Sequence, residues 1–154
     1  MPRMTGGEAL ARQLVREGVN VVFGLPGVQL YGALAGLRDE GVRFITTRHE
    51  QATTYMADGY ARAGGGFGTA LVVPGPGLLN AAAGLSTAYS ASSPVLMLCG
   101  QVPRRYIGRD VGVLHEVNDQ MQAIAPVTIG EALEVPLNVS VYQRSSLVPP
   151  CRSP

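Results

Sequence analysis

Short apolar runs alternate with stretches of helical periodicity up to about residue 103. The apolar runs are rich in β-branched side chains, which is typical of strands covered on both faces. Strands are expected at Val19–Phe23, Val42–Ile45, Thr69–Val73 and Pro94–Leu98. Helices are expected between them, at Thr5–Gly18, Gln29–Leu37, Glu50–Arg62 and Leu78–Tyr89. This alternation predicts an α/β fold, in which a parallel sheet carries helices on both faces.

The two ends of the chain differ in character. Thr5-Gly-Gly-Glu8 has the form of a capping box and predicts the start of the first helix. None of the 20 glycines lies after Gly130, whereas four of the 11 prolines fall between Pro136 and the end. Val135–Val141 is the one strand candidate there, and Ser145–Pro154 has the composition of an unfolded tail. We therefore expect a domain at 1–127 and a poorly ordered tail at 128–154.

Charge is scarce and unevenly distributed. Charged residues make up 15% of the chain, against about 25% in a typical soluble domain, and none lies between Arg62 and Arg104. Prolines and polar residues interrupt this uncharged stretch, so it predicts buried structure and no membrane span. The net charge is +1 and the arginines are scattered, which gives no support to nucleic-acid binding.

The inventory of reactive side chains excludes several kinds of chemistry. All 12 basic residues are arginine, which excludes a lysine Schiff base and a P-loop. Cys99 and Cys151 are too few for a disulfide framework and fit a reducing, cytoplasmic compartment. The N-terminal residues show no secretory signal. With only His49 and His115 in the chain, no metal site is expected.

Two tight turns and one carboxylate are expected at a single edge of the sheet. Gly24-Leu-Pro-Gly27 and Pro74-Gly-Pro-Gly77 each follow a predicted parallel strand, and Glu50 follows another. Ligands of open α/β sheets bind at the carboxyl ends of the strands. The turns could also be plain connections, and Glu50 could be a solvated carboxylate that complements the dipole of its helix. Position alone leaves these alternatives open.

Four motifs in register point to a family. They are Phe23-Gly-Leu-Pro-Gly27, Arg48-His-Glu-Gln51 with Met56–Arg62, Pro74–Asn80, and Gly100-Gln-Val-Pro103. Together they resemble the N-terminal, pyrimidine-binding domain of thiamine diphosphate enzymes of the acetolactate synthase, pyruvate oxidase and benzoylformate decarboxylase type. The resemblance runs from about residue 4 to residue 127. It implies the Rossmann-like, three-layer fold of that domain and thiamine diphosphate as the cofactor.

The resemblance also implies roles for individual residues. Glu50 matches the catalytic glutamate that hydrogen-bonds a ring nitrogen of the aminopyrimidine and activates the cofactor for reaction with a small 2-keto acid. The remaining matched positions bind the cofactor or face the substrate. The cofactor-binding positions are Pro26, Gly27, Pro76, Asn80 and Gln101, and the substrate-side position is His115.

Two departures from the family pattern limit what the chain can do alone. No Gly-Asp-Gly motif is present, so magnesium and the diphosphate must be held by a diphosphate-binding domain or subunit outside this chain. We expect little turnover without that partner. Leu114-His-Glu116 stands where acetolactate synthases carry a Gln-Glu pair, which leaves decarboxylase, carboligase and oxidase activities open. FAD is compatible with the resemblance but has no support in the residues.

Other functions are also compatible with the sequence. A subunit of a split 2-keto acid decarboxylase and a non-catalytic fragment or interaction module are the alternatives. A generic nucleotide-binding module is weaker, because no G-x-G-x-x-G fingerprint is present. The uncharged helix expected at Leu78–Tyr89 predicts packing against a second copy, and hence a homodimer or higher oligomer.

Overall fold

The predicted parallel sheet is present in the computed structural model, which describes residues 4–129, 133–135 and 139–142. Four strands run parallel in the order β2-β1-β3-β4. They are β1 (Val21–Gly24), β2 (Arg43–Thr46), β3 (Gly68–Val72) and β4 (Val95–Gly100). Beyond β4 the sheet continues with two further strands. β6 (Val139–Tyr142) pairs antiparallel with β4, and β5 (Leu133–Val135) pairs antiparallel with β6. The α/β fold class is confirmed.

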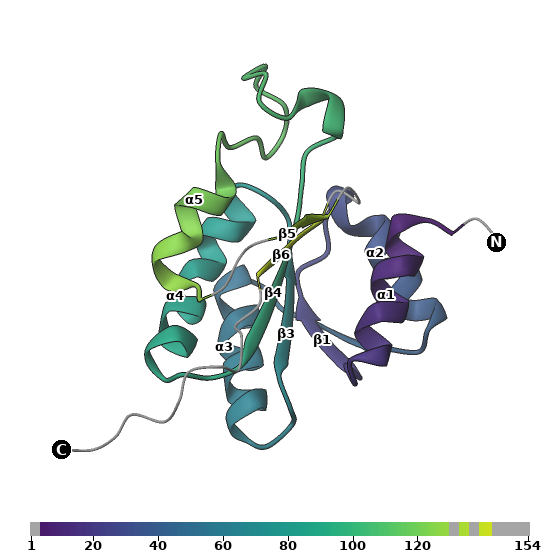
Figure 1. The fold of residues 1–154 in the computed structure, drawn as a ribbon, viewed down its shortest axis with the longest axis vertical. Coiled ribbons are helices and arrows are strands. Elements are labelled where there is room, and N and C mark those ends of the chain that lie inside the picture. The colour runs from purple at the N-terminus through teal and green to yellow at the C-terminus, as the bar shows by residue number, and fades with distance from the viewer. Residues whose placement is uncertain (1–3, 130–132, 136–138, 143–154) are drawn as a thin grey trace.

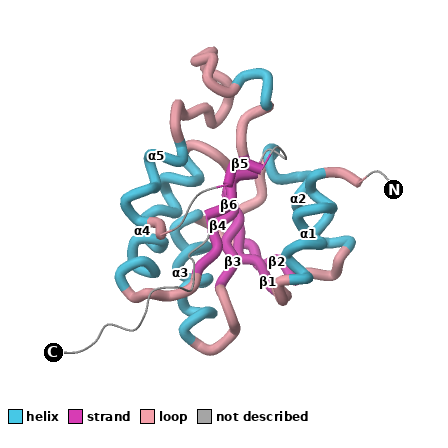
Figure 2. Tube along the Cα trace, in the orientation of Figure 1, coloured by secondary structure: helices cyan, strands magenta, loops and turns pink. Residues whose placement is uncertain are grey.

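Helices cover both faces of the sheet, as Figures 1 and 2 show. One face carries α1 (Gly6–Arg16) and α2 (Tyr31–Asp39), which follows a short 3-10 turn at Val28–Leu30. The other face carries α3 (Glu50–Arg62), α4 (Pro76–Ser90) and the short α5 (Gln120–Ile124). Between β4 and α5 the chain forms a long irregular segment, which extends at the top of Figure 1 and includes a 3-10 turn at Arg104–Tyr106.

The central strands are buried on both faces, as their continuous apolar runs predict. Along β3, Ala70 and Val72 belong to the core under α3 and α4, whereas Leu71 belongs to the core under α1 and α2. Along β4, Met97 and Leu98 alternate in the same way. This alternation follows from the period of two in a strand. A rigid sheet buried on both sides therefore supports the loops at its carboxyl edge.

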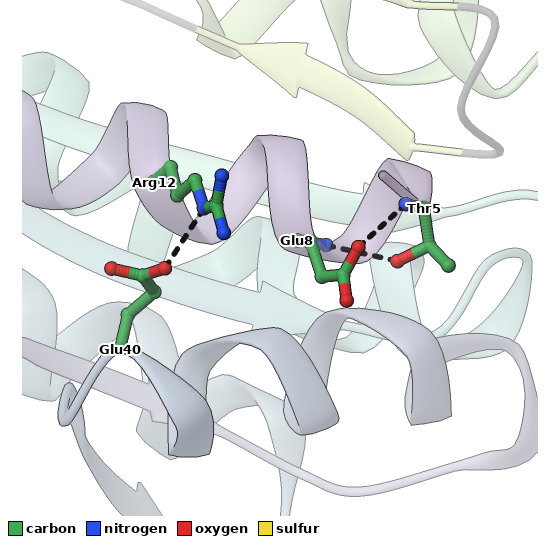
Figure 3. A network of polar contacts seen from close by, with 4 residues as sticks. All are labelled: Thr5, Glu8, Arg12 and Glu40. Carbon is green, nitrogen blue, oxygen red and sulfur yellow. Dashed lines mark hydrogen bonds and ion pairs between the residues drawn. The ribbon is translucent and has the colours of Figure 1, made fainter. Parts of the chain in front are cut away.

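α1 begins at the predicted capping box (Figure 3). The Thr5 hydroxyl accepts a hydrogen bond from the Glu8 N–H at 3.3 Å, and the Glu8 carboxylate accepts one from the Thr5 N–H at 2.7 Å. Further along α1, Arg12 donates to Glu40 at 3.0 Å and links the middle of α1 to the C-cap of α2. An exposed pair of this kind contributes only about 0–1 kcal/mol, so the packed faces of the two helices hold them together.

The helix boundaries agree closely with the sequence pattern. α3 spans the predicted Glu50–Arg62. α4 begins at Pro76, two residues before the predicted Leu78, because proline fits the first helical position, where its missing N–H is not needed. No element was predicted between residue 103 and the strand candidate Val135–Val141, because the apolar periodicity fades there. There α5 starts with Asp119 as its N-cap, whose side chain accepts a hydrogen bond from the Gln122 N–H at 2.8 Å.

The range 128–154 contains β5 and β6, and these overlap the strand candidate Val135–Val141. Ser145–Pro154 and Cys151 lie outside the described residues. The division into a domain at 1–127 and a poorly ordered tail therefore stays a prediction. Among the helices that the structure describes, none is both long and apolar enough to cross a membrane.

Candidate functional site

The parallel strands bring the predicted turns to one edge. β1, β3 and β4 end side by side, since Gly24 pairs with Leu71 and Val72 pairs with Cys99. The turn through Gly27 leaves β1 at this edge, and the turn through Gly75 leaves β3. β2 ends at the same edge and leads into the N-terminus of α3. The sequence prediction of a shared edge is confirmed.

Glu50 is the first residue of α3, and only 9% of it is exposed. His49 caps the helix through its Nδ1, which accepts a hydrogen bond from the Gln51 N–H at 3.2 Å. Glu50 Oε2 accepts a hydrogen bond from Asn80 Nδ2 on α4 at 3.0 Å. No residue in the described part of the chain hydrogen-bonds Glu50 Oε1. The site thus holds a buried carboxylate with one oxygen fixed and the other available, next to the positive end of a helix dipole.

Glycines allow two backbone turns to pack tightly against Val73 beside this carboxylate. A Cβ on Gly77 would lie 2.5 Å from Val73 Cγ2 and 3.6 Å from Glu50 Oε1. A Cβ on Gly27 would overlap Val73 Cγ1. Both turns therefore close onto Val73, which only glycine permits. A carboxylate oxygen, an apolar valine and two bare backbone turns fit a flat heterocycle whose ring nitrogen hydrogen-bonds a carboxylate.

A loop from the irregular segment lies over the second turn. Gly75, the N-cap of α4, has φ +59°, and a Cβ there would lie 2.5 Å from the carbonyl oxygen of His115. His115 itself has φ +68°, a backbone conformation that residues other than glycine rarely adopt. This backbone contact places His115 at the carboxyl edge of the sheet.

The His115 ring contacts a glutamine in the 3-10 turn at Val28–Leu30, directly after the first turn. His115 Nδ1 lies 3.2 Å from Gln29 Oε1, and Gln29 Nε2 donates to the Leu114 carbonyl at 3.3 Å. Gln29 and Leu114 also line a cavity of about 400 Å³ together with Gln101. The other residues that line this cavity are Val28, Pro103, Tyr106 and Val113. Most of them are apolar, which suits the carbon chain of a small ligand.

The predicted site residues form two groups. Glu50 and Asn80 are in direct contact, and Pro26, Gly27 and Pro76 lie on the adjoining turns. Gln101 and His115 form the second group, near Gln29: Gln101 lines the same cavity as Gln29, and His115 contacts Gln29 directly. The structure shows these positions, whereas the role of each residue stays a prediction.

Sequence reasoning missed three residues at this edge: Gln29, Val73 and Gly75. For Gln29 the only signal was its position two residues after the Gly24–Gly27 turn. Val73 reads as an ordinary strand residue, and Gly75 as an ordinary turn glycine. The reason both matter is their contacts with Gly27, Gly77 and the His115 backbone, and these contacts form only in the folded chain.

Cys99 lies in the core beside this edge and does not belong to the site. It is fully buried in β4, and burial raises the pKa of the Cys99 thiol. The neutral thiol is therefore the stable form, and a thiolate nucleophile at this position is disfavoured.

We expect Cys99 to resist thiol reagents. In a Cys151→Ser background at pH 8.5, labelling of Cys99 should be at least about 10³-fold slower than in the denatured chain, because the core must open first. Mass spectrometry after timed quenching measures this ratio. Comparable labelling rates in folded and denatured chain would contradict the described burial.

Comparisons with known proteins are consistent with this geometry. Residues 4–123 match the family model described as thiamine pyrophosphate enzyme, N-terminal TPP binding domain. The chain is 42% identical to a probable 2-ketoarginine decarboxylase of Pseudomonas aeruginosa, over 84% of its own length and 23% of that relative. It is 42% identical to a probable acetolactate synthase large subunit of Methanocaldococcus jannaschii, over 81% of the chain and 21% of the relative.

A third relative gives the same result. The chain is 44% identical to the acetolactate synthase isozyme 3 large subunit of Escherichia coli, over 71% of its length and 19% of that protein. The chain thus spans about a fifth of the length of the curated relatives it matches.

Proposed function

Because the chain belongs to the thiamine pyrophosphate enzyme family and forms its N-terminal TPP binding domain, we propose that it holds the pyrimidine ring of thiamine diphosphate for a reaction of 2-keto acids. Thiamine diphosphate is the same cofactor as thiamine pyrophosphate. The observation that carries the proposal is the buried Glu50 carboxylate, whose Oε1 accepts no hydrogen bond within the described residues and lies beside the backbone turn at Gly77.

Each residue of the Glu50 group has a part in this proposal. Glu50 Oε1 would hydrogen-bond a ring nitrogen of the pyrimidine, while Asn80 fixes the carboxylate through Oε2. The backbone turns at Gly27 and Gly77 would lie against the ring together with Val73. Pro26 and Pro76 hold these turns, since proline fixes φ.

The chemistry divides between the cofactor and the protein. When bound, the cofactor supplies an electron sink for the loss of carbon dioxide from a 2-keto acid. Glu50 holds and exchanges a proton at the ring nitrogen. Burial of Glu50 strengthens this hydrogen bond, because competing water is scarce and the local dielectric is low. On the other side of the edge, His115 and Gln101 would face the substrate.

The proposed site is completed by a second domain. Magnesium and the diphosphate would be held by a diphosphate-binding domain or subunit, since the chain spans only about a fifth of its relatives. A split enzyme and a non-catalytic module are not favoured, because in each relative the matching segment belongs to one longer chain. A cytoplasmic location, expected from the cysteine usage, is part of this proposal.

Reconstitution tests the proposal. The chain is mixed with the diphosphate-binding domain of the 2-ketoarginine decarboxylase relative, and carbon dioxide release is measured with thiamine diphosphate, magnesium and either pyruvate or 2-ketoarginine. We expect release only when both proteins are present, and the preferred substrate identifies the 2-keto acid. If the two proteins form a complex by light scattering and release no carbon dioxide from either acid, the proposal fails.

We also propose that α4 contributes to a homodimer interface. Leu79 and Tyr89 on α4 are 49% and 43% exposed, and Tyr55 and Met56 on α3 are exposed as well. Both helices lie on the same face of the sheet (Figure 1). Large apolar side chains gathered on one face of a protein favour association.

Leu79→Asp is therefore expected to weaken self-association. Light scattering coupled to size-exclusion chromatography should find a dimer for the wild type, and a dissociation constant raised at least about 10-fold in the variant, because a buried charge would lack a partner. Val15→Asp introduces the same charge on α1, at a residue that is 41% exposed on the opposite face, and serves as the control. A monomeric wild type at high concentration would contradict the interface.

A further inference from the structure

Gln29 links three parts of the carboxyl edge. It follows the turn after β1, its Nε2 donates to the Leu114 carbonyl at 3.3 Å, and its Oε1 lies 3.2 Å from His115 Nδ1. The sequence separation between Gln29 and His115 is 86 residues. Neither contact is a backbone hydrogen bond of a helix or of the sheet, and neither involves Glu50. The nitrogen and the oxygen of the Gln29 side-chain amide thus both contact the loop that carries His115.

The Leu114 carbonyl determines which way the Gln29 amide points. A carbonyl oxygen can only accept a hydrogen bond, so it must face the amide nitrogen. The amide oxygen then faces His115, and this oxygen also only accepts. A neutral imidazole has one N–H and one bare nitrogen. The ring nitrogen next to Gln29 Oε1 must therefore be the one that carries the proton.

From this geometry, and resting on the function proposed above, we propose that Gln29 is a positioning residue for His115. It holds the neutral ring in the tautomer with its proton on Nδ1. His115 Nε2 is then left as an acceptor, and no residue in the described part of the chain hydrogen-bonds it. The carboxylate and keto oxygens of a 2-keto acid only accept hydrogen bonds, so the group that suits Nε2 is an N–H or O–H donor on the substrate's side chain, or a proton to be taken up during the reaction.

The loop that carries His115 is held independently of Gln29. Glu116 Oε2 accepts hydrogen bonds from the N–H groups of Gly112 at 2.6 Å and Val113 at 3.0 Å. The Glu116 N–H donates to the Val113 carbonyl at 2.9 Å. The His115 backbone also lies against Gly75. The backbone of His115 is therefore placed by these contacts, and Gln29 acts chiefly on its ring.

The second histidine provides an internal reference. His49 Nδ1 accepts a hydrogen bond from the Gln51 N–H at 3.2 Å, so this nitrogen must be bare and Nε2 must carry the proton. The chain contains two histidines in all. The structure therefore predicts opposite tautomers for the only two imidazole rings of the protein.

Nitrogen NMR of the 154-residue chain tests this directly, without cofactor. Two-bond ¹H–¹⁵N correlation spectra of histidine-labelled protein distinguish the two neutral tautomers from each other and from the imidazolium form. His49→Gln assigns the signals. We expect a single Nδ1–H tautomer for His115 and a single Nε2–H tautomer for His49. An Nε2–H tautomer or a mixture at His115 in the wild type would overturn the proposal.

Two variants of Gln29 separate positioning from general support of the loop. Gln29→Leu removes the acceptor, so His115 should lose its single tautomer and become a mixture, while His49 stays unchanged. Gln29→Met also removes the amide oxygen but keeps a long unbranched side chain, so His115 should again become a mixture of tautomers. If Gln29→Leu shifts the backbone amides of 112–116, Gln29→Met decides alone: a mixture of tautomers at His115 supports the proposal, and a single Nδ1–H form contradicts it. A failure to bind thiamine would count against the proposed function but leave these spectra unaffected.

Discussion

Glu50→Gln is expected to lower the rate of 2-keto acid decarboxylation by about 10²–10⁴-fold, the range for a positioned acid–base group. Glutamine has nearly the same shape as glutamate and can still accept the hydrogen bond from Asn80. It can no longer hold and exchange a proton at the ring nitrogen. The variant therefore removes the chemistry of the carboxylate and keeps the packing of α3. The rate is measured with the reconstituted pair of domains.

A matched control distinguishes this effect from a general one. Glu17→Gln makes the same chemical change at an exposed residue that caps the C-terminal end of α1, and its rate should stay within about 2-fold of the wild type. Circular dichroism of both variants checks the fold. A Glu50→Gln enzyme with a near-normal rate would remove Glu50 from the mechanism.

Gly7→Ala is expected to reduce the free energy of unfolding by about 3 kcal/mol, the upper end of the usual cost of overpacking. Gly7 lies in α1, and a Cβ there would overlap the carbonyl group of Gly32 in α2. This contact is between two backbones, so no side-chain rotation can relieve it. The helices would have to separate, which would disturb the core under them and the Arg12–Glu40 link between them (Figure 3). Urea denaturation measures the change.

Gly32→Ala provides the opposite case on the partner helix. No atom lies within 4 Å of a Cβ at Gly32, and alanine is the better helix former by up to about 1 kcal/mol. The free energy of unfolding should thus be unchanged or slightly raised. A loss below about 1 kcal/mol for Gly7→Ala, or equal losses for both variants, would contradict the described helix contact.

The order of the elements and the shared edge could be predicted from local patterns. Continuous apolar runs mark the doubly covered strands, and the capping box at Thr5 marks α1. Glu50 was placed correctly at the edge because it follows a strand and begins a helix. These signals lie within a few residues of one another in the sequence, which is the range over which periodicity and capping act.

Contacts between distant residues could not be predicted in this way. Asn80 lies 30 residues after Glu50, on another helix, and only the packing of α4 on α3 brings them together. Gly7 was taken as part of a capping box, although its lack of a side chain is what permits the approach of α2. The segment between β4 and α5 has no apolar periodicity, so nothing in the pattern pointed to the pair of Gln29 and His115.

The central claim is that the Glu50 edge binds an aminopyrimidine, and an NMR titration of the chain with thiamine tests it most directly. Half a site should bind weakly, with a dissociation constant of about 1 mM, equivalent to about −4 kcal/mol. We predict amide shifts at Gly27, Gly77 and Asn80 that weaken strongly in Glu50→Gln, or with an analogue whose ring nitrogen is replaced by carbon. No shifts at millimolar thiamine, or shifts that persist unchanged with the analogue, would contradict the account.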